Sequence, residues 1–422
     1  MNNPLEAVRG GGALFADGPR SQQGRFSQLL LTNVLYWVCA GVYTPFLSAY
    51  FTRLGFGAYE VGVLLAVQPV CALAVQPVWS LIADRIGRRK QILVLLSVAA
   101  SALSIIYYVG TSFAGSLVVT FLFSAFFQAL LPLCDSLVIE AAERSGCPFS
   151  RIRMGGTIGY AAVVAVVGYA LEAVPALQFV IVSAALLVFA AQTARLPQPW
   201  RESDQKRSIR VAAERRGAKG DSGERGSGLL SIFDTTEIVY VLAFAFVDFL
   251  GLGFLGAFLG SWCIEIGYGQ ELVGTLSAIS AASEIPILFV SAALISRFGE
   301  LRLLGFSCIA MSLRLLFVGT GIVPVMMIGQ LLQSFSYMTV YFSCVTYISR
   351  HTYSTTRARG QSVLAMIQSG LAMVIASLFG GWLCDALGTA AAFRVFSALM
   401  ICGLVIVLVA RACLRGKTTS RL

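Results

Sequence analysis

Long apolar stretches, separated by short polar segments, dominate this chain of 422 residues. A helix needs about 20 apolar residues to cross about 30 Å of hydrocarbon, and only helices and closed barrels satisfy their backbone groups there. Charged residues make up 12% of the sequence, against about 25% in soluble domains. We therefore expect an all-α membrane protein with twelve transmembrane helices. The predicted spans are 26–51, 59–82, 91–110, 114–142, 152–173, 176–194, 236–262, 272–296, 302–320, 323–349, 360–384 and 390–411.

One polar segment is much longer than the others and divides these spans into six and six. It is rich in charged residues, Gly and Ser and has no apolar periodicity, which is typical of a linker. The predicted organisation is an N-terminal tail (1–25), a six-helix bundle (26–194), a linker (195–235), a second six-helix bundle (236–411) and a C-terminal tail (412–422).

The basic residues predict the orientation of the chain. Of the 31 Lys and Arg residues, all except Arg53, Arg314 and Arg394 fall on one side of the predicted spans. Basic loops face the cytoplasm, so we expect a multi-pass protein of the cell inner (plasma) membrane with both termini cytoplasmic. The anionic lipid bilayer at that surface accounts for the net charge of +10 without a nucleic-acid partner.

A shift of 212 residues brings the sequence into partial register with itself. Segment 41–66 then overlies 253–278 with several identical glycines, and the same shift places 85–87 on 297–299 without a gap. Chance similarity between Gly-rich and Leu-rich spans does not readily produce an ungapped register that ends in a matching loop. A six-helix unit repeated in parallel predicts two pseudo-symmetric bundles, a solute site between them and alternating access to that site.

The turn between the second and third predicted spans carries a motif. Gly87 allows the bend, and the basic residues suit the membrane surface; neither explains an acid at a fixed distance before the glycine. The segment resembles the signature loop of the major facilitator superfamily, with Ser80 in place of the usual Gly. The resemblance implies a conformational latch. Its residues are Asp84, Arg85, Gly87 and Arg88.

A narrower resemblance is most specific over residues 41–160. Within this range, 41–46, 132–135 and 149–160 resemble the branch of the superfamily that contains the lactose permease and the phenylpropionate permeases. There the matching positions carry an acid, an Arg and an aromatic residue that stacks on the sugar. The resemblance implies a substrate site formed by Asp135, Arg153, Thr157 and Tyr160.

Three ionisable residues, Asp248, Glu284 and Arg314, fall near the middle of predicted spans. At about 1.5 Å of rise per residue, each lies roughly 18 Å from a membrane face. A charge at this depth costs about 2.5–3.5 kcal/mol on insertion scales and usually has a function. A carboxyl whose surroundings change between two states also changes its pKa. We therefore expect Glu284, beside Arg314, to be the proton-coupling group, with Asp248 second.

Each assignment has a structural alternative. An ion pair of Glu284 with Arg314 serves equally to hold two neighbouring helices together. The same applies to Asp135 with Arg153 near the inner face, and Asp248 can bond to a neighbouring helix without a role in transport. The sugar permeases carry a Lys, a His and a Glu on the tenth span. The corresponding positions here are Gln330, Gln333 and Ser336, so that part of the coupling chemistry is not expected.

These features predict a secondary active transporter, monomeric, that moves a small-molecule substrate of the sugar, nucleoside or aromatic acid type with a proton. The alternative is an uncoupled facilitator or a proton antiport exporter on the same scaffold. A membrane sensor or membrane-bound enzyme is disfavoured, because the loops hold no catalytic constellation. No phosphate-binding loop and no Cys or His pattern typical of a metal site occurs in the sequence, so we expect no cofactor and no metal.

Overall fold

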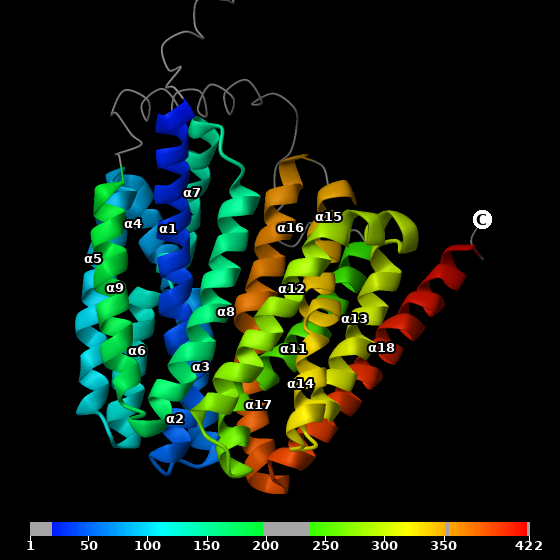
Figure 1. The fold of residues 1–422 in the computed structure, drawn as a ribbon. Helices are drawn as coiled ribbons and strands as arrows, with labels where there is room; N and C mark the ends of the chain where they lie inside the picture. The colour runs from blue at the N-terminus through cyan, green and yellow to red at the C-terminus, as the bar shows by residue number, and fades with distance from the viewer. Residues whose placement is uncertain (1–18, 197–235, 352–353, 420–422) are drawn as a thin grey trace, which may run out of the picture.

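The computed structural model describes residues 19–196, 236–351 and 354–419. Every element in these ranges is a helix, which confirms the all-α prediction. Figure 1 shows the first half of the chain, in blue to green, beside the second half, in green to red. Most of the predicted N-terminal tail (1–18) and of the predicted linker (197–235) lies outside the described residues.

The helices follow the predicted spans, several of which are divided into shorter pieces. In the first half they are α1 (Pro19–Tyr43), α2 (Leu47–Arg53), α3 (Ala58–Ala74), α4 (Gln76–Ile86), α5 (Arg89–Ile105), η1 (Ile106–Tyr108), α6 (Phe113–Phe127), α7 (Leu130–Ser145), α8 (Phe149–Ala173) and α9 (Leu177–Arg195). In the second half they are α11 (Thr236–Glu265), α12 (Gln270–Phe298), α13 (Glu300–Val318), α14 (Val323–Leu331), η3 (Ser334–Met338), α15 (Thr339–His351), α16 (Ser354–Met366), η4 (Ile367–Leu371), α17 (Ala372–Leu387) and α18 (Thr389–Thr419).

Two helices extend beyond the predicted spans into the segments predicted as tails. Helix α1 begins at Pro19, well before the predicted start at Phe26, and α18 continues to Thr419, beyond the predicted end at residue 411. Proline is well tolerated as a first helical residue because its missing N–H has no intrahelical partner there. No proline follows before Pro45, so the polar residues after Pro19 extend the helix.

Ten helices of the described chain are long and apolar enough to cross a membrane. Helix α12 bends by 44° between its two parts, Gln270–Ile287 and Phe289–Phe298, and counts as an eleventh span. Pro286 lies at this bend, where its ring and missing N–H disrupt the helical hydrogen bonds. The predicted span 323–349 consists of three consecutive pieces, α14, η3 and α15, so the twelfth crossing stays a prediction.

The same side-chain contact occurs in both halves. Ser101 Oγ of α5 lies 2.8 Å from Ser183 Oγ of α9, and Ser312 Oγ of α13 lies 2.8 Å from Ser397 Oγ of α18. The turn glycines Gly55 and Gly267, which the 212-residue shift superposes, have φ angles of 88° and 84°. The internal repeat of the sequence is therefore a repeat of structure.

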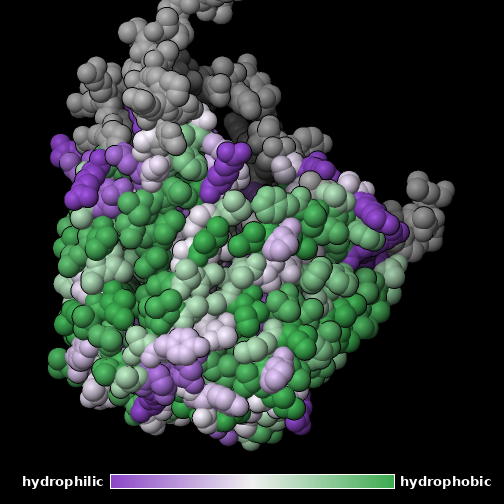
Figure 2. All heavy atoms as spheres, viewed as in Figure 1, coloured by the Kyte–Doolittle hydropathy of each residue, from purple (hydrophilic) through white to green (hydrophobic). Residues whose placement is uncertain are grey.

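The molecule has two ends, a linker face and a far face. The linker face is the end where α9 finishes and α11 begins, and the far face is the opposite end, where α2 and the end of α17 lie (Figure 1). Figure 2 shows a broad hydrophobic band between these ends, with hydrophilic residues gathered at the edges of the band. This distribution suits a protein whose middle is surrounded by hydrocarbon.

Candidate functional site

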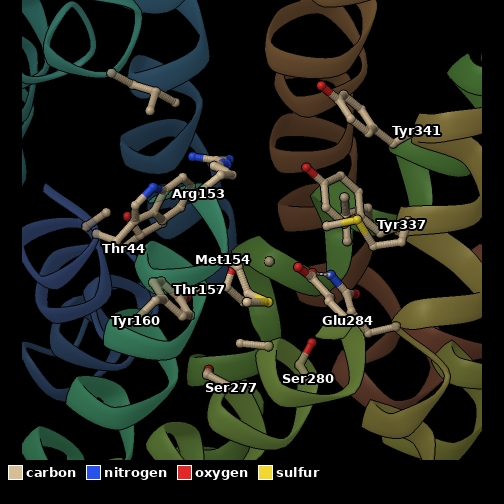
Figure 3. A pocket seen from close by; sticks show the side chains of 18 of the residues that line it. Thr44, Arg153, Met154, Thr157, Tyr160, Ser277, Ser280, Glu284, Tyr337 and Tyr341 are labelled. Atoms are coloured by element: carbon tan, nitrogen blue, oxygen red, sulfur yellow. Dashed lines mark hydrogen bonds between the residues drawn. The ribbon is translucent and has the colours of Figure 1, made fainter. Parts of the chain in front are cut away.

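A cavity of about 1280 Å³ lies between the two halves. Residues of α1, α7 and α8 form one wall, and residues of α11, α12, η3 and η4 form the other (Figure 3). The lining includes Phe149, Ser150 and Arg151, which belong to the first turn of α8, at the linker face. Typical small-molecule sites measure about 300–1,000 Å³. The cavity therefore has room for a small organic solute and is open toward the linker face.

At the far face, the two halves are in close contact. A Cβ atom on Gly62 of α3 would collide with the carbonyl oxygen of Ser377 in α17, and one on Gly274 of α12 would collide with that of Val164 in α8. The 212-residue shift superposes Gly62 and Gly274. Small residues let helix backbones approach closely in membranes. The two glycines therefore allow a symmetric closure of the cavity at the far face.

The first-half wall of the cavity holds a cation above an aromatic ring. The guanidinium carbon of Arg153 lies 4.2 Å from the centroid of the Trp37 ring, and Tyr160 meets that ring edge-on at 6.1 Å. Asp135 and Thr157 line the same wall (Figure 3 labels Thr157). All four residues that the family resemblance implied for a substrate site therefore lie together on one wall.

Several polar atoms of this wall are buried and make no hydrogen bond within the described chain. They are Asp135 Oδ1, Arg153 Nη1 and Trp37 Nε1. Asp135 and Arg153 do not form an ion pair within 4 Å among the described residues, in contrast to the contact that the sequence left open. A buried polar group without a partner costs about 1–3 kcal/mol. The wall therefore offers two donors and an acceptor to a solute.

The second-half wall is a continuous chain of polar contacts. Arg314 is 3% exposed and donates to Gln333 Oε1, to Gln330 Oε1 at 2.6 Å and to Ser280 Oγ at 3.0 Å. The amide of Gln333 in turn donates to Glu284 Oε1 at 2.8 Å. Glu284 and Arg314 are therefore linked through Gln333, whereas the sequence had suggested a direct ion pair. Both Glu284 and Arg314 line the cavity.

Asp248, the second proposed coupling group, lies behind this wall and not on the cavity surface. It is fully buried in α11, and neither carboxylate oxygen has a hydrogen-bond partner in the described residues. Such a group is expensive to bury in charged form. Asp248 is therefore out of direct contact with a solute in the cavity.

Both π-helical segments of the described chain reach the cavity. Tyr337 lies in η3 and Gln368 in η4, and Gln368 Nε2 donates to the Tyr337 hydroxyl at 3.4 Å. A π-turn widens the helix locally and is frequent at functional sites. Here the two segments turn Tyr337 and Gln368 toward the solute space.

The loop of the signature motif lies at the linker face, away from the cavity. Asp84 accepts hydrogen bonds from Arg89 Nε at 2.9 Å and Nη2 at 2.7 Å. Gly87 ends α4 with a φ of 68°, a conformation that favours glycine, and Arg85 and Arg88 are exposed. The Asp84 carboxylate thus bonds within its own half while the linker face is open.

Sequence reasoning missed Trp37, Ser280 and the bridging role of Gln333. A signal for Trp37 was available, because Trp37 and Thr44 are seven residues apart and two helical turns bring them to one face. Both line the cavity. The role of Gln333 depends on the distance between α12 and α13, which no local pattern contains.

Two helical halves around a central cavity, open at one face and closed at the other, are the architecture of a secondary transporter. The profile of the MFS_1 like family matches residues 27–395, so the chain belongs to this family of the major facilitator superfamily. The superfamily predicted from the Asp84 loop is thereby confirmed. The protein is a multi-pass membrane transporter for a small molecule.

Individual relatives agree with this assignment. A maltose permease of Geobacillus stearothermophilus is 25% identical over 402 residues, which cover 94% of this chain and 96% of the permease. The structure of the nucleoside transporter NupG has a TM-score of 0.77 at 16% sequence identity. The match covers 91% of this chain and 98% of the NupG chain. The structure of a D-xylose-proton symporter has a TM-score of 0.65 at 14% sequence identity. This match covers 90% of this chain and 96% of the symporter chain. These two structures share the fold.

Proposed function

We propose that the protein is a proton-coupled symporter of a small polyhydroxylated solute, of the sugar or nucleoside type. The observation that carries this proposal is the pairing of two unlike walls around one cavity. The wall of Arg153, Asp135 and Trp37 has unused donors and an acceptor. The wall of Glu284 and Arg314 has a buried carboxylate in a polar chain.

The unused groups favour a hydroxylated solute over an aromatic acid. A hydroxyl donates one hydrogen bond and accepts others, so two neighbouring hydroxyls can satisfy Asp135 and Arg153 together. A carboxylate only accepts, so it would satisfy Arg153 and be repelled by Asp135. The names of the maltose permease, the nucleoside transporter and the xylose symporter are in keeping with this preference.

We assign coupling to Glu284 because it lines the cavity and shares its hydrogen-bond partner with Arg314. Its carboxylate accepts from Gln333, and Gln333 is shared with Arg314. A solute that draws Gln333 or Arg314 toward itself leaves the carboxylate less stabilised as an anion, which favours protonation. Asp248 is the second candidate, because it is buried without a partner among the described residues.

An uncoupled facilitator is the competing function, and one observation favours it. The positions that carry ionisable groups in the sugar permeases are Gln330 and Gln333 here, and both serve as hydrogen-bond partners of Arg314. In a facilitator, Glu284 and Arg314 would only hold α12 and α13 together.

The orientation and domain boundaries are part of the same proposal. We assign the linker face to the cytoplasm and the protein to the inner membrane, on the strength of the basic residues on that side. The two transporting units are then 26–194 and 236–411, and the structure is open to the cytoplasm.

Binding and uptake by the purified protein test this proposal. A thermal-shift screen over sugars, nucleosides and aromatic acids identifies the solute, and uptake into proteoliposomes is then compared with and without an imposed proton gradient. Accumulation against the solute gradient only when protons flow inward is the expected result. Equal uptake in both conditions would establish the facilitator instead.

A further inference from the structure

Two carboxylates at the far face each bind the start of a helix in the opposite half. Glu172, in the last turn of α8, accepts a hydrogen bond from the backbone nitrogen of Gln270, the first residue of α12, at 2.7 Å. Asp385, in the last turn of α17, accepts from the backbone nitrogens of Ala58 and Tyr59, the first two residues of α3, at 2.9 and 3.0 Å.

These contacts supply caps that the two helices lack. The first backbone N–H groups of a helix have no intrahelical partner and carry a partial positive charge that attracts anions. The N-cap residues of α3 and α12 are Gly57 and Gly269, which have no side chain to cap with. The acid of the opposite half therefore takes the place of a capping side chain.

The arrangement is built twice, in keeping with the internal repeat. The 212-residue shift superposes Gly57 on Gly269 and Ala58 on Gln270, so both capped helix starts are equivalent. At Gly269, a Cβ atom would collide with the Glu172 carboxylate. A larger residue at this position would therefore force the Glu172 side chain to move away from the start of α12.

Further contacts hold the first of these acids in place. Arg53 Nη2 lies 2.7 and 2.6 Å from the two oxygens of Glu172. Nearby, Thr52 Oγ1 donates to Ser261 Oγ of α11 at 2.8 Å, which also joins the two halves. The side chain of Glu172 is 43% exposed, so water can replace these contacts when the halves separate.

We infer that Glu172 and Asp385 are state-determining residues of the transport cycle, which keep the far face closed until both helix starts are released. The inference rests on alternating access in the proposed function, but not on proton coupling or on the identity of the solute. Opening the far face must separate α8 from α12 and α17 from α3. It therefore breaks the bonds from Gln270 to Glu172 and from Ala58 and Tyr59 to Asp385. Neither acid touches the cavity.

Distances measured between spin labels on each face test this inference. Val109 and Ile322 are 82% and 57% exposed and lie at the far face in opposite halves, and Ile86 and Phe298 form the matching pair at the linker face. Each pair is replaced by labelled cysteines in a protein whose Cys147, Cys402 and Cys413, the cysteines that are not buried, are changed to Ser.

Glu172→Gln and Asp385→Asn should each raise the ratio of far-face-open to far-face-closed molecules on the order of tenfold, the effect of losing a hydrogen bond to a charged group. The linker-face pair should move closer together in the same molecules. Glu172→Asp, which keeps the charge, should restore part of the closed population. Glu60→Gln is the matched control, because Glu60 accepts from Gly57 within its own half, and it should change neither distance.

Gly269→Ala is an independent variant that retains both acids. Its methyl group displaces the Glu172 carboxylate from the start of α12, so it should open the far face as Glu172→Gln does. The inference would be overturned if Gly269→Ala, Glu172→Gln and Asp385→Asn all fold and leave the distances between the spin labels unchanged. The distances are recorded without solute or gradient. If the variants shift the population but uptake later proves to be independent of protons, the symport proposal fails and the role of Glu172 and Asp385 stands.

Discussion

The Arg314 guanidinium and the Glu284 carboxylate are joined through the side-chain amide of Gln333. The oxygen of that amide accepts from Arg314, and its nitrogen donates to Glu284 at 2.8 Å. A direct ion pair would fix both charges. A bridging amide lets the carboxylate gain or lose its proton while Arg314 keeps Gln330 and Ser280 as partners.

Glu284→Gln should abolish accumulation driven by a proton gradient and preserve exchange of labelled for unlabelled solute. The reason is that exchange needs no net proton movement, whereas accumulation requires a group that takes up and releases a proton. Uptake and counterflow in proteoliposomes measure the two activities side by side. Asp248→Asn is the comparison variant. Gradient-driven uptake that survives in both variants would show that neither acid couples transport to protons.

Arg153→Ala should remove solute binding without reducing expression, and Arg153→Lys should not restore it. A guanidinium presents several donors in a planar fork and stacks on an aromatic ring, as it does on Trp37, whereas an ammonium is a compact point charge. Titration calorimetry with the solute found in the screen measures the affinity. An unchanged affinity in Arg153→Ala would contradict the placement of the substrate site on the first-half wall.

Trp37→Phe should weaken binding by about fivefold, and Trp37→Leu should weaken it more. Phenylalanine keeps an aromatic face beneath Arg153 but removes the Nε1–H donor, and one hydrogen bond contributes about 1 kcal/mol. Leucine also removes the cation–π contact, which contributes about 0.5–2 kcal/mol. Binding affinity and thermal stability are measured together. If stability falls and affinity does not, Trp37 only supports the fold.

The paired serines offer a stability test of the internal repeat. A double-mutant cycle of Ser101→Ala with Ser183→Ala should give the same coupling energy as Ser312→Ala with Ser397→Ala. Hydrogen bonds between membrane helices contribute about 0.6 kcal/mol on average in such cycles. Unfolding in mixed detergent measures the coupling energies. A value near zero for one pair alone would show that the two halves are not equivalent in energy.

Much of the fold was predictable because it depends on local properties of the sequence. Hydropathy located the spans, since a long apolar helix requires a hydrocarbon environment. The 212-residue register predicted that Gly62 and Gly274 are equivalent, and both allow close contact at the far face. The Asp84 loop predicted the superfamily, which the match over 27–395 confirms.

The candidate site was predictable only in part, because its chemistry depends on distances between helices. Asp135, Arg153, Thr157 and Tyr160 do line one cavity with Glu284 and Arg314; their roles in binding and coupling stay predictions. The sequence could not show that Gln333 separates Glu284 from Arg314. Nor could it show that Glu172 caps a helix of the other half, because capping across an interface leaves no spacing pattern.

The most direct test of the central claim is a simultaneous measurement of solute and proton entry. Proteoliposomes without an imposed gradient receive the solute that the screen identifies, and internal pH is recorded alongside internal solute. The symport proposal predicts that the interior becomes more acidic as solute enters, in a fixed ratio, and that Glu284→Gln removes the acidification. Solute entry with no change of internal pH in the wild-type protein would contradict the proposal.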